Sequence, residues 1–117
     1  MTNDQYTLSM PEPTTTPRML QLQKLLEKEP NDAFLLYGLA LEFKKIGDAS
    51  KAIELFDRVM SADPGYCYAY FQKGLVMEGI GDLEQAKSTY RQGIAAAQKV
   101  GDAHAAQEIA GALNLIE

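Results

Sequence analysis

Few residues of this 117-residue chain could take part in catalysis or metal binding. His104 is the only histidine and Cys67 is the only cysteine, so neither has a second ligand of its own kind, and no intrachain disulfide can form. Acidic pairs such as Asp57 and Asp63 are scattered along helix surfaces, where charges are usually solvated. We therefore expect no enzymatic activity, no metal site and no cofactor. We interpret His104 as a surface residue and Cys67 as a half-buried structural one.

The glycines Gly79 and Gly81 superficially resemble a phosphate-binding loop. No strand precedes them, so we interpret them as part of a turn between helices. The net charge of −5 is spread evenly along the chain, which argues against nucleic acid as a partner. No apolar stretch approaches the length of a membrane span, and no secretory signal is visible. The expected location is the cytoplasm, without membrane association.

The strongest pattern in the sequence is self-similarity at an offset of 34 residues. The matched positions are Ile46-Gly47-Asp48 with Ile80-Gly81-Asp82, Ala40 with Gly74, Ala52 with Ala86, and Phe56 with Tyr90. Small residues recur where two helices would cross closely, and large apolar residues surround them at three- and four-residue intervals. The glycine suits the left-handed end of one helix and the aspartate suits the N-cap of the next.

This pattern resembles the tetratricopeptide repeat, a unit of two antiparallel helices. The first unit matches throughout, with Leu36-x2-Leu39-Ala40-x2-Phe43, then Ala52-x3-Phe56, then Pro64. The second unit departs at Lys73, where leucine is usual, and at Gln98, where proline is usual. The resemblance implies an all-α solenoid of about five antiparallel helices.

The same register extends to both sides of the two full units. We expect residues 1–16 to form a flexible tail, 17–29 an N-terminal capping helix, 33–66 the first repeat, 67–100 the second repeat, and 102–117 a C-terminal capping helix. Thr16 would be the N-cap of the first helix and Pro17 its first residue. The preceding helix is expected to run past Gln98, because the last helix follows at an offset of 36 residues.

The resemblance implies that the first helix of each repeat lines a concave groove for a polypeptide partner. The groove positions of this sequence are Phe34, Tyr37, Leu41, Lys44 and Lys45 in the first repeat, Tyr68, Phe71, Gln72, Leu75 and Glu78 in the second, and His104, Gln107 and Gly111 in the last helix. Most positions in the full repeats are aromatic or aliphatic, and we expect them to be dispensable for packing within a repeat. Tyr37 and Leu41 stand where a charged clamp for a terminal carboxylate would need Lys and Asn. An apolar or amphipathic segment is therefore the expected ligand.

The sequence alone leaves three questions undecided: how the groove positions pack, which function the protein has, and whether its own ends occupy the groove or form a dimer. The groove positions could instead pack against neighbouring helices. The function could be that of an adaptor or assembly scaffold, of a small acidic chaperone for an exported or aggregation-prone client, or of a docking subunit for an enzyme. The tail pattern Tyr6-x-Leu8-x-Met10, or Leu115 and Ile116 of the last helix, could also occupy the groove or support a homodimer.

Overall fold

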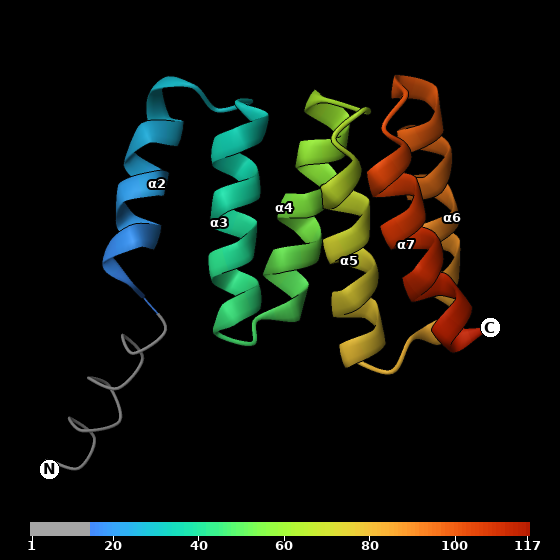
Figure 1. Cartoon of the computed structure of the whole chain (residues 1–117). Coiled ribbons are helices and arrows are strands. Elements are labelled where there is room, and N and C mark those ends of the chain that lie inside the picture. Colours follow the sequence, from blue (N-terminus) through green and yellow to red (C-terminus); the bar gives the residue numbers. More distant parts are fainter. Residues whose placement is uncertain (1–14) are drawn as a thin grey trace, which may run out of the picture.

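A computed structural model describes residues 15–117 and shows an all-helical chain over that range (Figure 1). Its helices are α2 (Pro17–Lys28), α3 (Ala33–Lys45), α4 (Ala49–Ala62), α5 (Cys67–Gly79), α6 (Leu83–Val100) and α7 (Ala103–Ile116). The described residues thus form six helices rather than about five, because two capping helices and two helical pairs add up to six. The expected tail lies outside the described residues except for Thr15 and Thr16. None of the described helices combines the length and apolar character that crossing a membrane requires.

Consecutive helices lie side by side in an antiparallel series (Figure 1). The closest pairs are α3 with α4, α5 with α6, and α6 with α7. Helix α4 packs on α5 and thereby joins the first helical pair to the second, while α2 packs on α3. Each helix contacts mainly its neighbours in sequence, as is typical of repeat proteins.

The helix ends follow the chemistry that the sequence predicts. Gly47, Gly81 and Gly101 have φ values of 85°, 83° and 77°, a left-handed conformation that glycine adopts without a Cβ penalty. The carboxylates of the following aspartates, Asp48, Asp82 and Asp102, each accept a hydrogen bond from a backbone N–H in the first turn of the next helix. At α2, the Thr16 hydroxyl accepts from the Met19 N–H and Pro17 begins the helix, as predicted. Local sequence therefore sets the turns between the paired helices.

The core consists of two clusters of buried residues. The first cluster comprises Met19, Leu22, Leu36, Leu39, Ala40, Ala52, Leu55, Phe56, Val59, Ala69 and Val76. The second comprises Cys67, Ala86, Tyr90, Ala97, Ala105, Ile109 and Leu113. In the second cluster the absent side chain of Gly74 makes room for the ring of Tyr90, which is fully buried. The close helix crossing expected from the small residues is present there.

The one buried carboxylate of the described residues ties α2 to α3. Glu42 is 6% exposed, and it pairs with Arg18 from α2 and with Lys45 from its own helix, at 3.6 and 3.4 Å. The Thr16 hydroxyl also donates to it, at 3.3 Å. These three partners together offset the desolvation of the buried Glu42 carboxylate. The ion pair with Arg18 therefore helps to hold α2 against α3, in addition to the apolar contacts of Met19 and Leu22.

Candidate protein-binding face

Helices α3, α5 and α7 are linked on one side of the protein by polar side chains. Lys44 Nζ of α3 donates to Gln72 Oε1 of α5, at 2.5 Å. The Tyr68 hydroxyl of α5 donates to Glu108 Oε1 of α7, at 2.7 Å. These bonds join helices that are not consecutive in sequence. The side of the protein on which these bonds lie is called the α3–α5–α7 face.

All nine principal residues expected for a groove belong to the helices of this face. They are Phe34, Tyr37, Leu41 and Lys44 on α3, Tyr68, Phe71, Gln72 and Leu75 on α5, and His104 on α7. Phe34 and His104 are exposed and the other seven are half-buried. Phe34 has 70% of its surface open to solvent, an unusual exposure for so large an apolar residue.

Two of these residues also contribute to packing, contrary to the sequence-based expectation. The Tyr37 ring lies 5.9 Å from the ring of buried Phe56 in an edge-on arrangement, and 4.9 Å from the ring of Tyr66. The Phe71 ring lies 6.3 Å from that of buried Tyr90. Each of these two rings therefore contacts the core on one side and remains partly exposed on the other. A large aromatic ring one helical turn away from the buried residues is long enough to reach them. The expectation that they are dispensable for packing was wrong.

Among the other predicted groove positions, some take part in packing or pairing and some are exposed. Leu41 packs against the first cluster and Leu75 against the second. Glu78 accepts a hydrogen bond from the Tyr90 hydroxyl and so turns toward α6. Lys45 pairs with Glu42, whereas Gln107 and Gly111 are exposed on α7. Fewer of the predicted groove residues are therefore open to solvent than the sequence indicated.

Burial and hydrogen bonding change the acidity of several groups on this face. Burial raises the pKa of Tyr37, and burial lowers the pKa of the Lys44 ammonium. The hydrogen bond to the Glu108 carboxylate raises the pKa of Tyr68 to about 12. The same carboxylate lies 3.4 Å from His104 Nε2, so Glu108 is shared by two neighbours. Tyr68 thus stays a hydrogen-bond donor over the whole physiological pH range.

The raised pKa of Tyr68 predicts a loss of stability in alkali. Its ordinary pKa is 10.0 and its folded value about 12, so the unfolded chain releases the proton first. The stabilisation is complete below pH 10 and falls as the pH rises from 10 toward 12. Tyr68→Phe is expected to lessen the alkaline decline in the urea midpoint. Equal declines for the two proteins would show that this hydrogen bond does not persist in solution.

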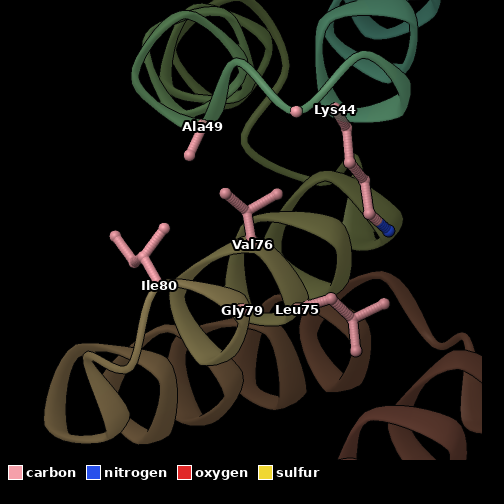
Figure 2. Close-up of a pocket in the computed structure, with 7 residues that line it drawn as sticks. Lys44, Ala49, Leu75, Val76, Gly79 and Ile80 are labelled. Atoms are coloured by element: carbon pink, nitrogen blue, oxygen red, sulfur yellow. The ribbon is translucent and has the colours of Figure 1, made fainter.

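A cavity that the sequence did not predict shares the residues Lys44 and Leu75 with the α3–α5–α7 face (Figure 2). The cavity has a volume of about 270 Å³ and is lined by Lys44, Gly47, Ala49, Leu75, Val76, Gly79 and Ile80. It lies between the turn that joins α3 to α4 and the end of α5. The only signal for it in the sequence is Ile80, a large apolar residue in a turn, which is 56% exposed.

Within residues 15–117, no three His, Cys, Asp or Glu side chains gather as a metal site would require. The Cys67 thiol is 5% exposed and donates to the Gly65 carbonyl oxygen, at 3.2 Å. Burial raises the pKa of this thiol, which disfavours the reactive thiolate.

Comparisons with known proteins agree with this architecture. The sequence profile of the tetratricopeptide repeat matches residues 35–66 and 68–100. A TPR repeat-containing protein of Pseudomonas aeruginosa is 34% identical over 88 residues, which cover 75% of this chain and 84% of that protein. The solution structure of a tetratricopeptide repeat domain protein from Salinibacter ruber is 34% identical, with a TM-score of 0.71 over 75% of this chain and 89% of that one.

A further solved structure is similar in fold alone. PcrH, in complex with the chaperone binding region of PopD, has a TM-score of 0.78 and 18% identity, covering 99% of this chain and 93% of that one. The profile match and the Pseudomonas relative carry the family assignment. The chain belongs to the tetratricopeptide repeat family of helical protein-interaction modules.

Proposed function

We propose that the chain is an adaptor or assembly scaffold that binds an apolar or amphipathic polypeptide segment along the α3–α5–α7 face. The observation that carries this proposal is a set of aromatic side chains, Phe34, Tyr37, Tyr68 and Phe71, left partly open on one side of consecutive repeats. Aromatic rings bury a large area and lose little rotamer entropy on binding, so they serve well as anchors.

The polar groups of the face favour a polypeptide over a purely apolar ligand. The side chains of Lys44, Gln72 and Tyr68 lie among the aromatic ones and can bond to the N–H and C=O groups of a bound segment. Helix–groove recognition combines apolar anchors with polar contacts of this kind. The face extends over three helices, which suits a segment longer than a single side chain.

A second candidate function is that of a small chaperone. The net charge of −5 and the small size support it. PcrH is described as binding a segment of PopD, and this chain shares its fold although not its sequence. The two candidates use the same face and differ in the number of partners. One tightly held client would support the chaperone, and several weaker partners the adaptor.

The proposal is tested by selecting binding peptides from a displayed random library and mapping them on the labelled protein by NMR. Peptides are expected to shift the amide resonances of α3, α5 and α7 more than those of α4 and α6. The double substitution Phe34→Ala and Tyr68→Ala is expected to weaken binding at least about tenfold, since it removes two anchors. Affinities are measured by fluorescence anisotropy.

The matched control removes two exposed leucines from α2. Leu20 and Leu25 are 56% and 51% exposed, so Leu20→Ala with Leu25→Ala deletes a comparable apolar area away from the face. This variant is expected to bind as the wild type does, and both variants are checked for an unchanged helical signal. Equal affinity of all three proteins, or shifts confined to α4 and α6, would refute the proposal.

A further inference from the structure

We propose that the cavity at the end of the α3–α5–α7 face receives an aliphatic side chain from an acidic peptide segment, and that Lys44 pairs with a carboxylate beside that side chain. This inference rests on the proposed function and specifies the chemistry of the partner. The apolar lining of the cavity holds the aliphatic side chain. The ammonium group of Lys44, the only one among the lining residues, holds the carboxylate.

The cavity is large enough for such a side chain. Its volume of about 270 Å³ exceeds the roughly 150 Å³ of an engineered protein cavity that binds benzene. Val76 projects into it from α5 and Ile80 from the turn that follows α5. Ala49 faces them from the start of α4, while the Lys44 side chain extends along the other side (Figure 2). The wall is therefore apolar and the charge lies at one side.

Lys44 differs from every other cation among residues 15–117. Lys51, Lys73 and Lys87 are also half-buried, and each has a carboxylate oxygen within 3.4 Å. The remaining lysines and arginines of the described range are exposed. Lys44 is the half-buried cation of this range that forms no salt bridge, and its recorded partner is the neutral amide oxygen of Gln72. A partly desolvated ammonium without a counter-ion gains more from an incoming carboxylate than a fully hydrated one does.

The carboxylates near Lys44 are engaged elsewhere. Glu42 binds Arg18 and Lys45, and Glu78 accepts a hydrogen bond from the Tyr90 hydroxyl. Asp48 and Asp82, in the turns after α3 and α5, accept from backbone N–H groups of the next helices. None of these four pairs with Lys44, so its ammonium group is the one that gains a counter-ion from an incoming carboxylate. Charge complementarity selects an acidic segment over a basic one.

The test uses three synthetic peptides of equal length. The first alternates leucine with glutamate, the second replaces the leucines by serine, and the third replaces the glutamates by lysine. Titration of the labelled protein, followed by NMR, is expected to show that the first peptide binds and shifts the amides of Gly47, Ala49, Gly79 and Ile80. The other two should bind at least about tenfold more weakly. Equal binding of the lysine peptide would overturn the role of Lys44.

Two substitutions with matched controls separate the cavity from the charge. A Cβ atom at Gly79 would meet nothing within 4 Å, so Gly79→Leu introduces a large side chain at a lining residue of the cavity, and the control Ala95→Leu introduces the same side chain at an exposed position of α6, outside the face. Gly79→Leu is expected to weaken binding of the first peptide at least about tenfold and Ala95→Leu to leave it unchanged. Lys44→Gln should remove most of the preference for glutamate over lysine peptides, whereas Lys24→Gln on α2 should not.

The outcomes distinguish this inference from the proposed function. If library-selected peptides bind the wild type and Gly79→Leu equally, the face binds polypeptides but the cavity plays no part, and the inference fails alone. If those peptides do not contact α3, α5 and α7 at all, the proposed function fails as well. If Gly79→Leu changes only the mass measured by light scattering, the cavity serves a second copy of the chain and the acidic-peptide inference is wrong.

Discussion

Substitution of Gly74 by alanine is expected to destabilise the protein by about 2–3 kcal/mol, because overpacking a well-packed core costs amounts of this order. A Cβ atom at Gly74 would lie 2.7 Å from Cζ of Tyr90 and closer still to Cε1 and Cδ1. The Tyr90 ring is fully buried and its hydroxyl donates to Glu78, so it has little freedom to retreat. Alanine is a better helix former than glycine by about 1 kcal/mol, which is too little to offset the clash. Thermal unfolding is expected about 10 °C lower.

Two further variants test that explanation. Gly111→Ala places the same methyl group in a helix with no neighbour within 4 Å, so it should leave stability unchanged or raise it by up to about 1 kcal/mol. Tyr90→Phe releases the ring from Glu78 and should recover part of the loss when combined with Gly74→Ala. A Gly74→Ala protein as stable as the wild type would mean that α5 and α6 lie far enough apart at Gly74 to admit a methyl group beside the Tyr90 ring.

Substitution of Phe56 by alanine is expected to cost about 3–5 kcal/mol, the usual range for truncating a buried phenylalanine. Phe56 is 0% exposed in the first cluster, and its ring also supports Tyr37 on the α3–α5–α7 face. Since small domains are stable by only about 5–15 kcal/mol, the loss would leave a marginal protein. It should also loosen the Tyr37 ring and weaken binding of any peptide that contacts it. Urea unfolding and peptide titration measure the two effects.

The control for Phe56 is a large apolar residue outside the core. Leu115 is 87% exposed, and Leu115→Ala is expected to change stability by less than about 0.5 kcal/mol. Tyr37→Phe keeps the ring contact with Phe56 and should be close to neutral as well. If Phe56→Ala unfolds at the wild-type urea concentration, the first cluster is not the core of the fold.

Much of the architecture could be predicted because its determinants are local or periodic. Gly47 and Asp48 determine a helix end and the next N-cap through their own backbone and side-chain chemistry. The recurrence of Gly74 with Tyr90 at the spacing of Ala40 with Phe56 predicts helices that cross closely. Such features need no knowledge of distant residues.

The openness of the candidate face could not be predicted in the same way. Helical periodicity identifies the side of a helix on which Tyr37 and Phe71 lie. How far they are covered depends on the width of neighbouring side chains such as Tyr66 and Tyr90, which come from other helices. The cavity beside Lys44 depends likewise on the distance between a turn and the end of α5.

Helix α5 supplies buried residues to both clusters of the core. Ala69 and Val76 belong to the first cluster, which therefore extends beyond the first repeat, while Cys67 belongs to the second cluster. In a linear array of coupled units, a shared element of this kind makes the folding of one unit conditional on the folding of the next. A displacement of α5 on ligand binding would therefore alter the packing of both clusters. Helices α2 and α7, at the two ends of the described array, are by contrast the elements from which opening would begin.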